Sequence, residues 1–138
     1  MIRFRLLLVL GLVSLAAQLL QAAPKVQLKK GDRIVFIGGT LAEREQYFGH
    51  VEARLHATFP DLELTVRNQG FTADEVRFRP RSLDFGEPDK HLTMARADVI
   101  MAFFGFAESF DGPEGVATFK KELRDFIAHT KKQNYSGK

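Results

Sequence analysis

The chain has 138 residues and no cysteine, and it carries 20 basic and 17 acidic side chains. Without cysteine it has no disulfide and no thiol for a lipid anchor, so packing alone must hold the fold. Arg3 and Arg5 lie in an N-terminal leader, which leaves 18 basic and 17 acidic side chains in the remainder. A nearly neutral domain lacks the clustered positive charge of a nucleic-acid or membrane-surface binder, so neither partner is expected.

Residues 1–23 have the layout of a secretory signal peptide. Two arginines open the segment, an apolar run of 12 residues follows at 6–17, and two alanines precede Pro24. The run is too short for a comfortable membrane span. An uncleaved anchor is the alternative, because leucines extend the apolar stretch beyond the run. We expect a secreted or periplasmic protein with no stable membrane insertion after cleavage.

Residues 24–138 are predicted to alternate strands and helices within one α/β domain. Continuous apolar runs indicate buried strands, and apolar residues at helical spacing indicate helices that cover the sheet. This alternation predicts a doubly wound parallel sheet in the order second, first, third strand. The predicted elements are a strand at 32–37, a helix at 42–58, a strand at 62–66, a strand at 97–104 and a helix at 114–132.

The strand at 97–104 would lie at the edge of this sheet with a neighbour on one side only. A long apolar edge strand is an aggregation hazard that natural proteins avoid. A further strand is what this architecture supplies next, yet the chain stops after a loop-like tail at 134–138. We therefore expect the N-terminal portion of a larger domain, incomplete at its C-terminus. A complete small domain is the alternative.

Three short motifs follow the predicted strands, where ligands collect in parallel α/β sheets. They are Gly-Gly-Thr-Leu at 38–41, Arg-Asn-Gln-Gly at 67–70 and Phe-Gly-Phe-Ala-Glu at 104–108. Together they resemble the first three sequence blocks of the secreted SGNH (GDSL-type) hydrolases. The resemblance implies a flavodoxin-like SGNH hydrolase fold and an ancestral action on acyl or acetyl esters, including esters of carbohydrates.

The resemblance also implies site residues. Thr40 stands where the family has its nucleophilic serine, and the Gly70 backbone N–H corresponds to an oxyanion donor. The resemblance implies substrate contacts at Gly39, Asn68 and Glu108. No cofactor and no metal are expected, since the four histidines show no ligand spacing with nearby carboxylates. A small-molecule ester or carbohydrate is the implied ligand, and the oligomeric state is left open.

Departures from the family pattern predict weak or absent hydrolysis. Ala107 replaces the oxyanion asparagine, and the Asp-x-x-His block that would orient and activate a nucleophile is not present. A hydroxyl without a base is a poor nucleophile. Thr40 and Glu43 also form a capping box, which predicts a structural role for the threonine. A non-catalytic binding or structural module on an SGNH-like scaffold is therefore the alternative function.

An arginine-rich loop follows the second motif. Arg77, Arg79 and Arg81 alternate there with apolar residues. They could bind a sulfate, a carboxylate or a sugar acid. The alternative, which the sequence favours, is a solvated loop whose arginines pair with nearby acidic residues such as Asp74.

Overall fold

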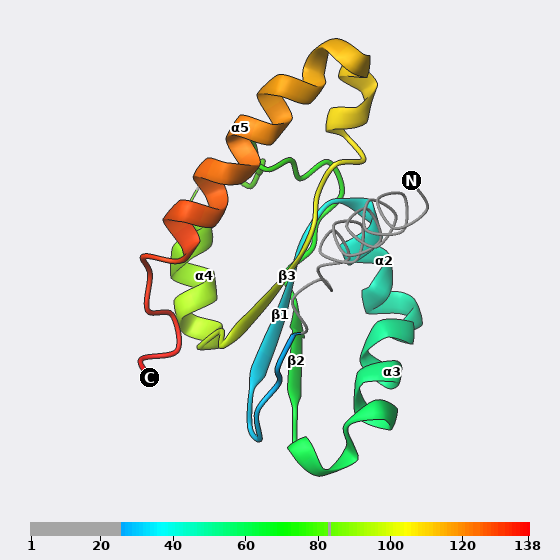
Figure 1. Cartoon of the computed structure of the whole chain (residues 1–138), viewed down its shortest axis with the longest axis vertical. Coiled ribbons are helices and arrows are strands. Elements are labelled where there is room, and N and C mark those ends of the chain that lie inside the picture. The colour runs from blue at the N-terminus through cyan, green and yellow to red at the C-terminus, as the bar shows by residue number, and fades with distance from the viewer. Residues whose placement is uncertain (1–25, 83) are drawn as a thin grey trace, which may run out of the picture.

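The computed structural model describes residues 26–82 and 84–138 (Figure 1). The predicted signal peptide lies outside the described residues. None of the helices described is long and apolar enough to cross a membrane. The elements are β1 (Arg33–Gly38), α2 (Thr40–Phe48), α3 (His50–Thr58), the 3-10 turn η1 (Pro60–Leu62), β2 (Thr65–Asn68), α4 (Pro88–Ala95), β3 (Val99–Phe103), the 3-10 turn η2 (Glu108–Asp111) and α5 (Gly112–Thr130).

The three strands form a parallel sheet in the order β2-β1-β3, as predicted. Ile34 at the centre pairs with Val66 on one side and with Val99 on the other. Within the described ranges, β3 pairs only with β1, so its other edge carries no strand there. The prediction of an edge position for the third strand is confirmed for this part of the chain.

Side chains of β1 alternate between two apolar cores. Ile34 and Phe36 pack on the face covered by α3, and Val35 and Ile37 pack on the opposite face with Leu92 of α4. Figure 1 shows α2 and α3 on one side of the sheet and α4 and α5 on the other. Helices on both faces of a parallel sheet make the chain a doubly wound α/β fold, and the three-strand layout is consistent with a flavodoxin-like arrangement.

The single helix predicted at 42–58 is wrong, because Gly49 divides it into α2 and α3. Gly49 adopts a left-handed φ of 63°, which ends α2, and its N–H donates to the Glu45 carbonyl at 2.9 Å. The Glu45 carboxylate then accepts the N–H of Val51 at 2.8 Å in the first turn of α3. Tyr47 and Phe48, at the end of α2, are exposed.

The start of β2 and the presence of α4 also differ from the sequence prediction. The second strand begins at Thr65 rather than at residue 62, because the 3-10 turn η1 and a left-handed Glu63 precede it. Helix α4 is not among the predicted elements, since its eight residues bury a single apolar side chain, Leu92. Such a short helix shows little apolar periodicity in the sequence.

Helix α5 and the C-terminal segment close one side of the molecule. The predicted helix at 114–132 is confirmed within two residues at each end, with Pro113 in its first turn. Val116 and Ile127 of α5 are exposed, because the three described strands offer this helix little sheet surface to cover. Beyond α5, Tyr135 is buried against the β1 and α4 core, and its hydroxyl donates to Asp89 at 2.5 Å.

Candidate functional site

The three sequence motifs meet at the carboxyl edge of the sheet. The Gly39 N–H donates to the Phe103 carbonyl at 3.2 Å, and the Phe71 N–H donates to the Gly38 carbonyl at 2.9 Å. Gly38 has a φ of 118°, and a Cβ added to it would lie 2.4 Å from the Phe103 oxygen. Only glycine allows this close approach of the two strand ends.

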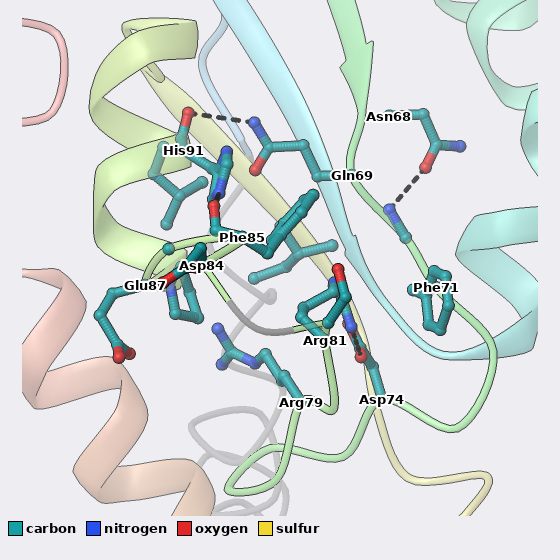
Figure 2. Close-up of a pocket in the computed structure, with 16 residues that line it drawn as sticks. Asn68, Gln69, Phe71, Asp74, Arg79, Arg81, Asp84, Phe85, Glu87 and His91 are labelled. Carbon is teal, nitrogen blue, oxygen red and sulfur yellow. Dashed lines mark hydrogen bonds and ion pairs between the residues drawn. The ribbon is translucent and has the colours of Figure 1, made fainter.

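Gly70, predicted to be an oxyanion donor, is packed tightly against the start of α2. A Cβ added to Gly70 would lie 2.5 Å from the Cβ of Ala42. The Gly70 N–H donates to Asn68 Oδ1 at 2.8 Å, as Figure 2 shows. Asn68 Nδ2 in turn donates to the Ala42 carbonyl at 2.6 Å. Asn68 and Gly70 thus fasten the end of β2 to α2, and an oxyanion role would require Gly70 to give up its present bond.

The capping box predicted at Thr40 is wrong. Gly39 occupies the N-cap position, Thr40 is the first helical residue, and no side chain caps the helix. The Glu43 carboxylate instead accepts a hydrogen bond from the Thr72 hydroxyl. The reason is that the double-glycine turn begins α2 one residue earlier than the capping box requires. Among the described residues, no histidine forms a hydrogen bond with the Thr40 hydroxyl.

Glu108 joins two loops at the same edge of the sheet. Its Oε1 accepts the Val76 N–H at 2.8 Å, and its Oε2 accepts the Gly105 N–H at 2.9 Å. Both oxygens therefore hold backbone groups that would otherwise lack a partner. Gly39, the other predicted substrate contact, is buried, and a Cβ there would lie 3.1 Å from the Asp74 carbonyl oxygen.

A cavity of about 670 Å³ opens beside these motifs. It lies between the end of β2, the loop from Phe71 to Glu87, and α4 (Figure 2). Asn68 and Gly70 line it, whereas Gly39, Thr40 and Glu108 are not among its described lining residues. The polar side chains that line it are Asn68, Gln69, Asp74, Arg79, Arg81, Ser82, Asp84, Glu87 and His91.

An ion pair between Arg81 and Asp74 forms one wall of this cavity. Arg81 Nη1 and Nη2 donate to the two Asp74 oxygens at 2.6 and 2.8 Å. The Asp74 side chain is 2% exposed and that of Arg81 19%. The guanidinium lies 4.5 Å from the centre of the Phe71 ring. The sequence interpretation that a loop arginine pairs with Asp74 is confirmed for Arg81, although this pair is mostly buried rather than solvated.

Arg79 has a different environment. Its guanidinium carbon lies 5.1 Å from the ring centre of Phe104 and 5.2 Å from that of Phe126. Nη2 donates to the Val76 carbonyl at 3.2 Å, and the buried Nε has no hydrogen-bond partner in the described part of the chain. Burial lowers the pKa of Arg79, because a desolvated guanidinium holds its charge less readily.

His91 and Phe85 form the opposite wall. Their rings stack with centres 4.4 Å apart, and His91 Nε2 lies 2.9 Å from the Phe85 carbonyl oxygen. Gln69 Nε2 donates to the His91 carbonyl at 3.1 Å and so connects β2 to α4. This wall was not predicted from the sequence, because α4 was not among the predicted helices. Pro88 after an acidic residue was the available helix-start signal.

Comparisons with family models, curated proteins and solved structures found no match. Within residues 26–82 and 84–138, no group of three or more histidine, aspartate or glutamate side chains is placed to hold a metal ion.

Proposed function

We propose that this chain is an exported, SGNH-like α/β domain that binds a small polar ligand of carbohydrate type and hydrolyses esters weakly or not at all. The observation that carries the proposal is the cavity at the carboxyl ends of the parallel strands, whose lining combines hydrogen-bonding side chains with apolar surface. Ligands of open α/β sheets bind at this edge.

The lining is suited to a polar ligand of sugar size. Amide, hydroxyl and carboxylate groups of Gln69, Ser82 and Asp84 can donate to or accept from hydroxyls on a ligand. Phe71 and Phe85 are 48% and 47% exposed and add apolar ring surface at the same cavity. A few polar groups beside aromatic surface are typical of small-molecule sites.

The residues at the same edge of the sheet are poorly suited to efficient catalysis. Thr40 has no hydrogen bond to a histidine among the described residues, and the Gly70 N–H is held by Asn68. Ala107 offers no side-chain donor for an oxyanion. Removal of one oxyanion donor alone typically costs about 10²–10³ in rate.

Ester hydrolysis is the second candidate, favoured by the convergence of three hydrolase-like motifs at one sheet edge. An assay with p-nitrophenyl acetate and butyrate compares the full chain with Thr40→Ala. The proposal predicts that both proteins show only background hydrolysis. Clear turnover in the wild type that is lost in a folded Thr40→Ala variant would make Thr40 a nucleophile and overturn the non-catalytic proposal.

A further inference from the structure

Among the described residues, Arg79 is a partly buried cation with no carboxylate in salt-bridge contact, although Asp74 and Asp89 act on it at longer range. Arg81, two residues on, has both terminal nitrogens on Asp74. By contrast, no salt bridge joins Arg79 to an acidic side chain in the described part of the chain, and the Val76 carbonyl is the one acceptor recorded for its guanidinium there. Buried charges in proteins are normally paired, so this guanidinium has unused capacity for an anion.

Arg79 lies between this cavity and a second one of about 650 Å³ that Asp89 and Phe126 also line. Figure 2 shows Arg79 projecting into the space between Glu87 and Arg81, and its side chain lines the cavity. Its guanidinium also contacts the rings of Phe104 and Phe126. Because the side chain is already ordered and partly desolvated, an incoming anion would meet a fixed donor group at little further entropic cost.

Other charged groups at the cavity limit what can bind. Asp74 and Arg81 neutralise each other through their paired bonds. Asp84 and Glu87 are exposed at the rim, where solvent and salt screen their repulsion of an anion. Glu87 also lines the cavity near Arg79 and can compete for it.

We infer that the cavity takes a carboxylate-bearing ligand of sugar size, such as a uronic acid, whose carboxylate binds Arg79. The inference rests on the proposed function and adds the charge and the anchoring residue. A planar carboxylate matches the two-pronged donor geometry of a guanidinium. Gln69 and Ser82 would then bind the hydroxyls of the same ligand.

The test is a calorimetric titration of the full chain with D-glucuronate and, separately, with D-glucose. We expect glucuronate to bind at least about tenfold more tightly than glucose, with an affinity that falls as salt is added. Arg79→Gln should abolish this preference, whereas Arg79→Lys should retain part of it. Arg77→Gln is the matched control, because Arg77 is on the same loop and carries the same charge but does not line this cavity. It should leave both affinities unchanged.

The outcomes separate the inference from the proposed function. If glucose and glucuronate bind equally and Arg79→Gln changes neither, the carboxylate inference is overturned while the proposed binding function stands. If neither sugar binds, both fall. Arg79→Lys provides the second variant should Arg79→Gln fail to fold. An undiminished preference for glucuronate in that variant would contradict the two-pronged contact with Arg79.

Discussion

The ion pair between Asp74 and Arg81 gives the sharpest prediction of stability. Asp74→Asn keeps the volume of the side chain but leaves a guanidinium, only 19% exposed, without its counter-charge. Breaking one partner of a buried pair costs about 3–5 kcal/mol, and the residual exposure of Arg81 places this case near 3 kcal/mol. With a urea m-value of about 1–3 kcal/mol per M, the unfolding midpoint should fall by about 1–3 M.

The assay is urea unfolding followed by circular dichroism, with Arg77→Gln as the control. Arg77 Nη1 lies 3.6 Å from Glu122 Oε1, but the Arg77 side chain is 80% exposed. Loss of this ion pair in Arg77→Gln should therefore cost less than about 1 kcal/mol. Addition of Arg81→Gln to Asp74→Asn should cost less than the sum of the single changes, because the unpaired charge is removed. If Asp74→Asn cost no more than Arg77→Gln, the reasoning would be refuted.

Three further predictions concern the ends of the strands and the C-terminal segment. Gly70→Ala should lower thermal stability by about 1–3 kcal/mol, because the new Cβ would overlap Ala42, and a neutral result would contradict the tight contact. Thr40→Ala should change the free energy of unfolding by less than about 0.5 kcal/mol, and a loss above about 1 kcal/mol would restore the capping hypothesis. Burial alone would raise the pKa of Asp89, but hydrogen bonds from Tyr135 and His129 lower it below its ordinary value. A depressed folded-state pKa contributes stability that is present above about pH 4 and is lost as the pH falls below it. Tyr135→Phe should therefore flatten the pH dependence of urea midpoints below about pH 4, and an unchanged slope would count against the bond.

The sequence predicted the order of the sheet because its strands carry strong apolar runs. The continuous apolar run along β1 is typical of a central parallel strand, which is buried on both faces. Helix boundaries were harder to predict. Gly49 interrupts a pattern that otherwise continues at helical spacing, and its left-handed conformation follows from contacts that periodicity alone does not encode. Helix α4 is fixed mainly by Leu92 and by its neighbours in space.

The candidate site was predicted only in part. The three motifs lie together at the carboxyl edge of the sheet, since parallel strands bring those ends together. The motifs did not indicate which of their residues would contact a ligand and which would hold the backbone. The side chains of Asn68 and Glu108 form hydrogen bonds that hold the backbone in place. That role depends on distances between loops far apart in the sequence. The different environments of Arg79 and Arg81 likewise appear only once the loop is folded against aromatic rings.

An amide chemical-shift titration of the full chain, labelled with ¹⁵N, tests most directly whether this cavity is the ligand site. D-Glucuronate is added to saturation, and each backbone amide is followed. We predict that the largest shifts cluster at Asn68 to Phe71, at Arg79, Arg81 and Ser82, and at His91, which line the cavity from three segments. Shifts confined to other faces of the domain, or no shifts at saturating ligand, would contradict the account.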